Sequence, residues 1–128
     1  MAFMLDTNIA IDLRDNNAAV ADRIATLTGG IVLSSITAVE LEAGVYRDPA
    51  NAPNRRARLD KILDAIPVLD FTAHAAAAYG GVVAQVGYSR RKIIDHMIAA
   101  HAIASRHTLV TRNAADFAAI SGLALERW

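Results

Sequence analysis

Apolar residues in this chain fall into short uninterrupted runs and longer stretches with helical spacing, and the two kinds alternate along the sequence. Short runs typical of buried strands cover residues 3–5, 31–33, 67–69, 108–110 and 124–127. Helical spacing covers residues 9–13, 18–27, 37–46, 55–66, 72–86, 95–105 and 113–120. Because alternating strands and helices form parallel sheets covered on both faces, the pattern predicts an α/β fold. We expect a three-layer α/β/α sandwich with a mainly parallel sheet, in a single domain over residues 1–128.

Two helical stretches and two loops stand out in this pattern. Residues 55–66 place four leucine and isoleucine side chains on one side, as expected for a helix that packs on a core. Residues 95–105 are apolar nearly all round, which predicts a buried helix. Pro49 and Pro53 indicate a loop before residue 55, and residues 87–92 indicate a basic loop before the buried helix.

Composition narrows the range of partners and chemistry. The chain is 54% hydrophobic, enough for one core, and it has no cysteine, which excludes disulfides and thiolate metal sites. The 13 basic and 13 acidic residues cancel, so nucleic-acid binding would depend on local patches. Asp6 interrupts the first apolar run, no basic segment precedes it, and no apolar run approaches the ~20 residues that span a bilayer. We therefore expect a soluble, cytoplasmic protein with no membrane partner.

Four acidic residues stand where the predicted strands give way to helices. Asp6 directly follows the strand at residues 3–5, and Asp95 opens the buried helix. Glu40 and Asp116 lie in the first predicted turns of the helices that follow the second and fourth strands. Because ligand sites in parallel sheets lie beyond the carboxyl ends of the strands, these acids are predicted to converge in one place.

Each acid, taken alone, also has a structural interpretation as a helix cap. Residues 37–40 and 113–116 resemble capping boxes, and Asp6 and Asp95 occupy positions suited to N-caps. As a set the acids are harder to explain in this way, because Asp6 and Asp95 lie among apolar residues where a bare carboxylate is costly.

Several carboxylates in one pocket repel each other and raise each other's pKa, and a divalent cation relieves that repulsion. All-oxygen ligation without cysteine suits Mg²⁺, with Mn²⁺ as the alternative. Such a site can activate water and neutralise the charge of a phosphodiester. Four neighbouring polar residues are candidates to hold the acids or their waters, namely Thr7, Asn8, Thr111 and Asn113.

Four segments of the sequence resemble the motifs of PIN-domain nucleases, in the same order. Residues 4–8, MLDTN, are similar to the first motif, and residues 34–44, SSITAVELEAG, to the second, whose functional acid matches Glu40. Residues 95–102, DHMIAAHA, are similar to the third, with its acid at Asp95. Residues 109–113, LVTRN, followed by Asp116 and Phe117, are similar to the fourth. The likeness extends nearly end to end and is closest to the VapC and FitB toxins of toxin–antitoxin systems.

This resemblance implies a Mg²⁺-dependent endoribonuclease acting as the toxin of a VapBC-type pair, with tRNA as one candidate substrate. Asp6, Glu40, Asp95 and Asp116 would then be both catalytic and metal-binding. The resemblance also implies homodimers, a cognate VapB-like antitoxin and a toxin–antitoxin hetero-oligomer. An antitoxin arginine would fit an acidic pocket, and the helices around residues 39–46 and 59–66 could supply a groove for an apolar antitoxin segment.

The sequence departs from the family pattern at two places. Many relatives carry Asp at the position of Asn113, so Asp116 is expected to take over as the fourth acid, as in relatives with an acid just before the Phe. Residues 92–94, KII, are less polar than the family pattern before Asp95. Candidates for contact with RNA phosphates lie in the basic loop and after the fourth strand, namely Arg90, Arg91, Lys92 and Arg112.

Other functions remain open at this point. A PIN nuclease that serves RNA processing without a toxin role fits the same residues, and so does an inactive module that binds RNA or protein. A haloacid-dehalogenase-like phosphatase needs a second Asp where this chain has Asn8, and a receiver domain needs a Lys at the end of its last strand. His96 and His101 are interpreted as packed or solvated side chains rather than general bases.

Overall fold

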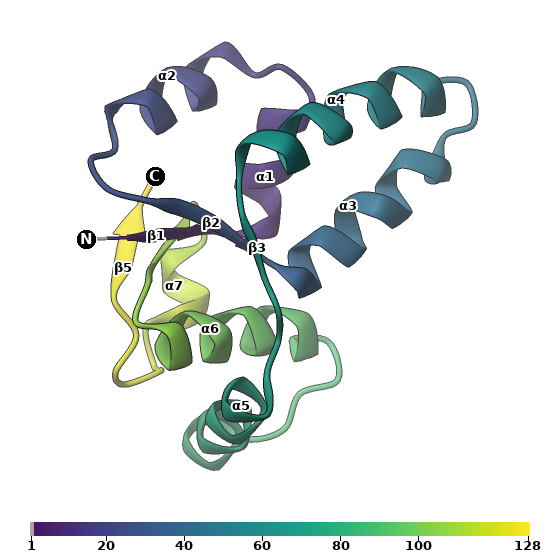
Figure 1. The fold of residues 1–128 in the computed structure, drawn as a ribbon. Coiled ribbons are helices and arrows are strands. Elements are labelled where there is room, and N and C mark those ends of the chain that lie inside the picture. The colour runs from purple at the N-terminus through teal and green to yellow at the C-terminus, as the bar shows by residue number, and fades with distance from the viewer. Residues whose placement is uncertain (1) are drawn as a thin grey trace.

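The computed structural model describes residues 2–128 and contains a five-stranded sheet whose strands all run parallel. The strands are β1 (Phe3–Leu5), β2 (Ile31–Ser34), β3 (Val68–Leu69), β4 (Thr108–Thr111) and β5 (Leu125–Arg127). Their order across the sheet is β3-β2-β1-β4-β5, with β1 at the centre (Figure 1). The predicted strands and their parallel arrangement are therefore confirmed.

Helices connect the strands and cover both faces of the sheet. They are α1 (Thr7–Arg14), α2 (Ala18–Thr26), α3 (Ser35–Arg47), α4 (Ala52–Ala65), α5 (Ala73–Val86), α6 (Ile93–Ser105) and α7 (Ala114–Phe117). Figure 1 shows α1, α2 and α4 on one side of the sheet and α5, α6 and α7 on the other. This is the three-layer α/β/α arrangement that the alternating pattern predicts.

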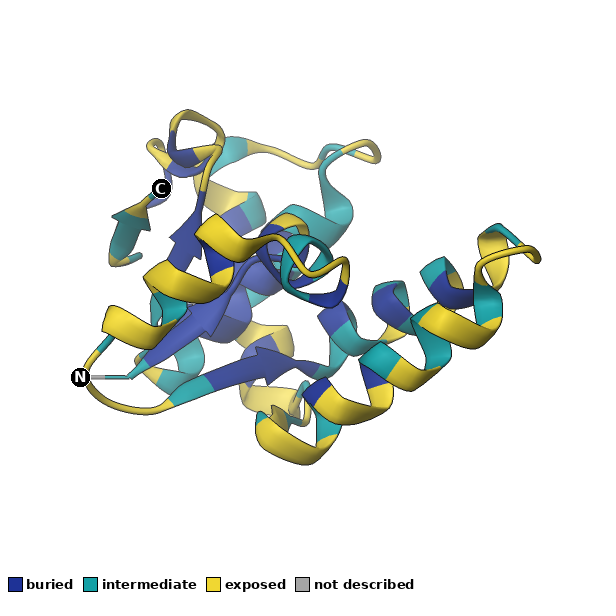
Figure 2. Ribbon diagram, turned by 90° about the horizontal axis from the view of Figure 1, so that it is seen from above, coloured by how far each residue is buried: buried dark blue, intermediate teal, exposed yellow. Residues whose placement is uncertain are grey.

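Alternating side chains along the strands divide the core between the two faces. Phe3 and Leu5 of β1 pack in a cluster with Leu59 of α4, whereas Met4 packs in a second cluster with Ile98 of α6. This follows from the two-residue repeat of a strand, which sends neighbouring side chains to opposite faces. Burial of each large apolar side chain contributes roughly 1.5–3 kcal/mol relative to exposure. Figure 2 shows the central strands as the most buried part of the molecule.

Several helices begin or end away from their predicted bounds; α1 begins at Thr7 rather than residue 9, and α6 at Ile93 rather than Asp95. Three further differences have local reasons. The Ser34 hydroxyl accepts a hydrogen bond from the Ile36 amide at 3.1 Å, so α3 begins at Ser35 and not at residue 37. Pro53 lies in the first turn of α4 rather than in a loop, because a proline there removes no helical hydrogen bond. The predicted helix over residues 113–120 is only the single turn of α7, and the Asn113 side chain does not cap it.

Helices α3 and α4 form a pair that extends beyond the sheet (Figures 1 and 2). Arg56 of α4 links the pair, because its guanidinium contacts Glu42 of α3 at 2.5 Å and Asp60 of its own helix at 2.8 Å. The apolar stripe predicted for residues 55–66 is confirmed, since Leu59 and Ile62 are buried in the core. Between residues 2 and 128, the helices are all too short or too polar to cross a membrane.

Candidate active site

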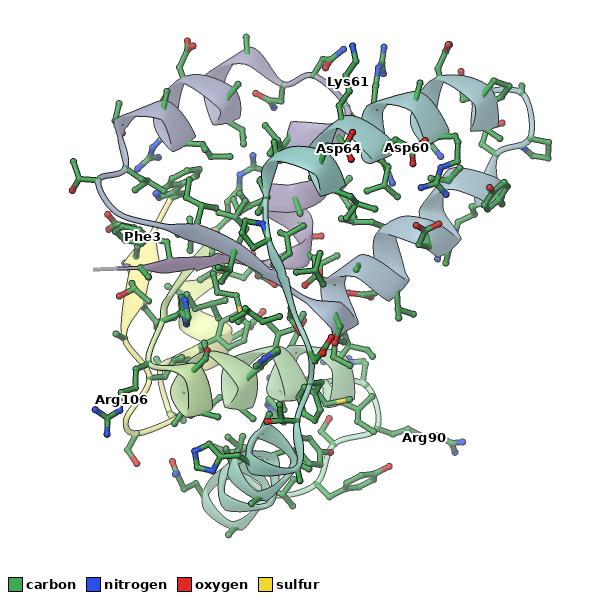
Figure 3. The ribbon with its side chains drawn as sticks, viewed as in Figure 1. Phe3, Asp60, Lys61, Asp64, Arg90 and Arg106 are labelled. Carbon is green, nitrogen blue, oxygen red and sulfur yellow. The ribbon has the colours of Figure 1, made fainter. Side chains whose placement is uncertain are left out.

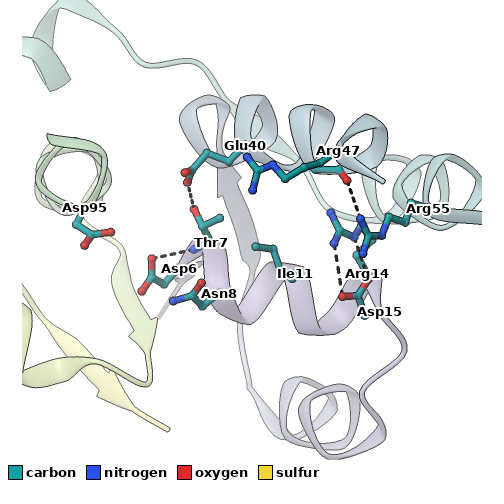
Figure 4. A pocket seen from close by; sticks show the side chains of 11 residues that line it. Asp6, Thr7, Asn8, Ile11, Arg14, Asp15, Glu40, Arg47, Arg55 and Asp95 are labelled. Carbon is teal, nitrogen blue, oxygen red and sulfur yellow. Dashed lines mark hydrogen bonds and ion pairs between the residues drawn. The ribbon is translucent and has the colours of Figure 1, made fainter. Parts of the chain in front are cut away.

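Acidic side chains from three elements meet in one pocket at the carboxyl edge of the sheet. Asp6 directly follows β1, Glu40 lies on α3 after β2, and Asp95 lies in the first turn of α6. All three line a pocket of about 450 Å³, together with Thr7 and Asn8 (Figure 4). The structure therefore brings together three of the four acids that the sequence predicts to converge.

Asp6 is the most buried of these acids, with only 3% of its surface exposed. Its Oδ1 accepts a hydrogen bond from the Thr7 amide at 2.8 Å, and its Oδ2 accepts one from the Thr111 hydroxyl at 2.7 Å. Burial raises the pKa of the Asp6 carboxyl above its usual value, the two hydrogen bonds oppose that shift, and the charges of Asp95 and Glu40 add to it. Asp6 is thus a buried carboxylate, hydrogen-bonded at both oxygens, that feels the charges of two other acids.

Glu40 is held in place by a chain of hydroxyl groups. The Thr7 hydroxyl donates to Glu40 Oε1 at 2.7 Å and lies 3.2 Å from the hydroxyl of Thr37. Because a hydroxyl has one proton to donate, the Thr37 hydroxyl must act as the donor to Thr7 in this arrangement. Thr7 therefore supports both acids, Asp6 through its amide and Glu40 through its side chain, and Glu40 keeps its Oε2 for other partners.

Asp95 and Asp116 are close enough to influence each other, but they do not line the same pocket. Burial raises the pKa of the Asp95 carboxyl, the charge of Asp116 raises it further, and His96 and Lys92 lower it. Asp116 is exposed in the single turn of α7 and lines a separate hollow with Lys92 and His96. The fourth predicted acid is therefore a neighbour of Asp95 outside the pocket itself.

The capping interpretation applies to Asp6 but not to the other three acids. Asp6 is the N-cap of α1, whereas the residue before α6 is Lys92 and Asp95 lies within the helix. Glu40 is in the second turn of α3, not the first, and its carboxylate accepts from a side chain of another helix. Asn113 makes no side-chain cap, so residues 113–116 do not form the capping box that their sequence resembles.

The donor set suits a hard divalent cation. Asp6 is a buried carboxylate near two more acids, and within residues 2–128 it has no ion pair with a basic side chain. The acids line the pocket without gathering into a closed cage, because no three His, Asp or Glu groups among residues 2–128 are close enough to bind one ion together. Mg²⁺ does not need such a cage, since it keeps several waters and takes one or two carboxylates plus substrate phosphates. The residues present therefore fit this ion.

The basic residues predicted to contact RNA lie outside the pocket. Arg90 and Arg91 are exposed in the loop before α6, and Figure 3 shows Arg90 extending away from the molecule. Lys92 is partly buried beside Asp116. Arg112 forms an ion pair with Asp12 of α1, so part of the Arg112 guanidinium is already occupied by a carboxylate. Among the supporting residues, the Asn113 amide donates to the Thr111 hydroxyl at 3.0 Å and so steadies the group that holds Asp6.

Three arginines that the sequence interpretation did not assign to the site line the pocket. They are Arg14 at the end of α1, Arg47 at the end of α3 and Arg55 near the start of α4. The sequence held a signal for two of them. Arg14 lies seven residues after Thr7, and Arg47 lies seven residues after Glu40, and residues at this spacing share a helix face. That signal becomes meaningful only once α1 and α3 are known to face each other.

Both histidines of α6 are packed, as expected from the sequence. His96 is buried, and burial lowers the pKa of its imidazole. His101 is buried as well, lies 2.8 Å from the Ser34 hydroxyl through Nδ1, and packs edge-on against Phe71. Neither lines the acidic pocket.

The chain matches a known protein family over nearly its whole length. The profile of the PIN domain matches residues 3–123, so this chain belongs to the PIN-domain family. Within that family it is similar to VapC ribonucleases. It is 34% identical over 132 residues to the tRNA(fMet)-specific endonuclease VapC of Shigella flexneri, covering 100% of this chain and 98% of the relative. It is also 34% identical to ribonuclease VapC2 of Rickettsia felis, with the same coverage.

Solved structures give the same result. VapBC2 from Rickettsia felis, bound to a DNA fragment from its promoter, matches with a TM-score of 0.86 and 32% identity, covering 100% of this chain and 99% of the other. DNA-bound VapBC from Salmonella typhimurium matches with a TM-score of 0.86 and 30% identity, covering 100% and 98%. The sequence-based resemblance to PIN-domain toxins is confirmed.

Proposed function

We propose that this chain is a divalent-metal-dependent endoribonuclease that acts as the toxin of a VapBC-type pair, in the cytoplasm where its RNA substrate is found. The observation that carries the proposal is the convergence of Asp6, Glu40 and Asp95 on one pocket at the sheet edge. The proposal is also supported by the full-length similarity of this chain to VapC ribonucleases. Mg²⁺ is the proposed ion, with Mn²⁺ as the alternative, because the donors are all oxygens.

Asp6 and Asp95 would hold the metal, because both are carboxylates whose pKa is raised mainly by burial and which gain from a bound cation. Glu40 would bind the ion or one of its waters through Oε2, and Asp116 would act from outside the pocket through water. When bound, a divalent cation neutralises phosphate charge and lowers the pKa of a coordinated water.

The chain's own part in the reaction is to orient the acids and the strand that is cut. The Thr7 amide and the Thr111 hydroxyl fix both oxygens of Asp6, and the Thr7 hydroxyl fixes Oε1 of Glu40. Asn8 lines the pocket and would orient a water or a phosphate there. Arg90, Arg91 and Lys92 would contact the RNA backbone outside the pocket, and Arg112 would do so from its ion pair with Asp12.

The proposed antitoxin is a VapB-like protein that places an arginine in the acidic pocket. Solved relatives are described as VapBC structures, and one as FitAcB from Neisseria gonorrhoeae. An arginine fork offers two hydrogen bonds to carboxylates where the metal would otherwise bind, so antitoxin and metal would compete. Of the two predicted groove-forming stretches, residues 59–66 use Leu59 and Ile62 in the core, whereas Val39 and Tyr46 on α3 are exposed. We therefore assign the apolar contact to α3.

A cleavage assay tests the enzymatic part. The purified chain is incubated with total bacterial RNA and with Mg²⁺, Mn²⁺ or EDTA, and the new RNA ends are mapped by sequencing. We expect discrete cuts with either metal and none with EDTA. An Asp95→Asn preparation made in parallel must be inactive, which excludes a contaminating nuclease. Cuts that persist in EDTA, or a parent chain that binds RNA without cutting it, would contradict the proposal, and the second result would favour the inactive-module alternative.

The toxin part needs a separate test. The chain is purified from its native host with any bound protein, and cleavage is compared before and after that protein is removed. We expect removal to release activity and added Mg²⁺ to weaken the complex. Equal activity with and without every co-purifying protein would favour the RNA-processing alternative. Light scattering of the free chain and of the complex would test the expected homodimer and hetero-oligomer.

A further inference from the structure

The pocket at the candidate active site has two chemically different ends. One end has Asp6, Glu40 and Asp95, and the other has Arg14 and Arg55 with the single carboxylate of Asp15 (Figure 4). The Arg47 side chain extends from that second end along α3 toward Glu40. Two guanidinium groups beside one carboxylate give this basic end a net charge of +1, and Arg47 adds a third guanidinium along the pocket. The metal chemistry of the acidic end gives no role to these arginines.

The two ends are joined by a groove between α1 and α3. On α1 the lining residues Thr7, Ile11 and Arg14 follow each other at spacings of four and three, so they share one helix face. On α3 Glu40, Gly44 and Arg47 do the same. On each helix, a residue of the acidic end lies seven positions before an arginine. At a rise of ~1.5 Å per residue, the backbones of these two positions are roughly 10 Å apart along the helix axis. Figure 4 shows the Arg47 side chain running along this groove.

Arg14 is unusual because it is buried, with only 4% of its surface exposed, and yet it lines the pocket. Its Nε and Nη2 lie 3.1 Å and 3.5 Å from the Asp15 carboxylate. Its Nη1 is buried and has no hydrogen-bond partner among residues 2–128. An unpaired buried donor on a charged group is costly, so this nitrogen is poised for an acceptor that enters the pocket.

The opposite wall is shaped to admit this guanidinium. A Cβ atom at Gly44 would lie 2.7 Å from Arg14 Nη1, so α3 makes room for Arg14 by having a glycine at this turn. Arg55 is fixed at the same turn, because its Nη1 donates to the Gly44 carbonyl at 3.0 Å. Arg47 is exposed, and it has no ion pair with a carboxylate among residues 2–128.

We propose that Arg14, Arg47 and Arg55 form a phosphate-binding subsite that takes a backbone phosphate of the RNA adjacent to the one that is cut. Guanidinium forks match phosphate geometry, and a strand lying along the groove would present one phosphate at each end. The substrate would thus be held at a fixed distance from the acids, and its register in the groove would be set by α1 and α3. This inference rests on the proposed function for the identity of the ligand as RNA.

Binding measurements with bulk bacterial tRNA in EDTA test the subsite without cleavage. We expect Arg47→Gln and Arg55→Gln each to raise the tRNA dissociation constant by about tenfold, which corresponds to about 1.4 kcal/mol of binding free energy. The slope of log affinity against log salt should also become shallower by about 0.7 for each single-strand phosphate that the variant no longer neutralises. Arg58→Gln is the matched control, because Arg58 is on the same helix as Arg55 but does not line this pocket. It should change neither the affinity nor the slope.

Gly44→Ala tests the role of Arg14 without changing any charge. The added Cβ should displace the flexible Arg14 guanidinium rather than the backbone. We expect weaker tRNA binding with an unchanged circular dichroism spectrum. In a cleavage assay with Mg²⁺, all three pocket variants should raise KM more than they lower kcat, because they leave the acids intact.

The outcomes separate this inference from the proposed function. Normal tRNA affinity and KM in the arginine variants of an active nuclease would overturn the subsite and leave the function standing. Equal losses in Arg58→Gln would also overturn it, because the effect would then be one of general charge. Loss of binding to a co-purified antitoxin with normal tRNA binding would assign the arginines to a protein carboxylate instead. Weakened tRNA binding in a chain that cuts no RNA would support the subsite and contradict the nuclease.

Discussion

The acidic and basic ends of the pocket are built in different ways. Asp6 directly follows the central strand, and its two oxygens accept hydrogen bonds from Thr7 and Thr111. The arginines lie instead near the ends of helices, and Arg47 is exposed. The acids are therefore held by a buried framework before any ligand binds, whereas the arginines depend on how α1, α3 and α4 pack together.

This difference matches what each end is proposed to do. Metal ligands need fixed geometry, and their mutual repulsion is tolerable only in a framework that holds them. Phosphate contacts position a long, mobile substrate and gain from side chains that can adjust. Changes at the acidic end should therefore affect chemistry, and changes at the basic end should affect binding.

The largest effect is expected from removing a charge at the acidic end. Asp6→Asn keeps the shape of the side chain and an oxygen acceptor for the Thr7 amide, but it removes a proposed metal ligand. Cleavage of total RNA should fall by more than about a hundredfold, because several kcal/mol of charge stabilisation are lost. Thermal unfolding in EDTA should show a stability equal to or above that of the parent, since a desolvated carboxylate has been neutralised.

Asp64→Asn is the control for that variant, because Asp64 is exposed on α4 and does not line the pocket. It should leave both cleavage and stability unchanged. Full activity in Asp6→Asn would remove Asp6 from the metal site.

The two ends also differ in how well the sequence predicts them. Asp6 and Asp95 could be predicted as site residues from the sequence, because an acid beside a buried strand or an apolar helix is unusual. Parallel strands also bring such positions to the same edge of the sheet. The arginines could not be predicted, because Arg14 and Arg47 line the same pocket only through the packing of α1 on α3.

The fold itself was predictable from the same pattern, but its local boundaries were not. The parallel strands and the buried α6 follow from runs and periodicity, which depend on many residues at once. The start of α3 depends on one hydroxyl, that of Ser34. Because the helix begins at Ser35 and not at residue 37, Glu40 lies in its second turn rather than its first. Caps of this kind are decided by single hydrogen bonds that a sequence pattern does not reveal.

A smaller effect is expected from the hydroxyl chain that holds Glu40. Thr7→Val keeps the shape of the side chain and removes the hydrogen bond to Glu40 Oε1. We expect cleavage to fall by about 10–100-fold, as for other residues that orient metal ligands, with a stability loss of about 1 kcal/mol. Thr7→Ser retains the hydroxyl and should recover most of the activity. If Thr7→Ser were as impaired as Thr7→Val, packing rather than the hydrogen bond would explain the loss.

A still smaller effect is expected at Asp116, which lies outside the pocket. Asp116→Ala should reduce cleavage roughly fivefold, or about 1 kcal/mol of barrier. The stability change should stay within about 0.5 kcal/mol, because the residue is exposed and makes no side-chain cap. The pKa of Asp95 should fall in this variant, because the charge of Asp116 raises it. An NMR titration of the Asp95 carboxyl group measures that shift, and an unchanged cleavage rate would assign Asp116 no part in the reaction.

The smallest effect is expected in the pH dependence of stability without metal, where the acidic end should oppose the trend set by ordinary ion pairs. Burial raises the pKa of Asp6 in the folded chain above its value in the unfolded chain. The folded chain therefore binds more protons between those two pKa values, and its stability falls as the pH rises through them. Glu42 has the opposite influence, because its pKa is lowered by Arg56, so the parent profile mixes the two trends.

The contribution of Asp6 can be isolated by comparing urea unfolding of the parent and Asp6→Asn in EDTA between about pH 4 and pH 8. The stability of the variant relative to the parent should increase with pH and then level off above the folded-state pKa. Saturating Mg²⁺ should reverse the difference, because only the parent keeps the full set of ligands and a ligand that binds the folded chain stabilises it. Asp64→Asn should show a difference from the parent that does not depend on pH. A similarly constant difference for Asp6→Asn would mean that Asp6 is not desolvated in solution, and the contrast between a buried Asp6 and an exposed Arg47 would then be lost.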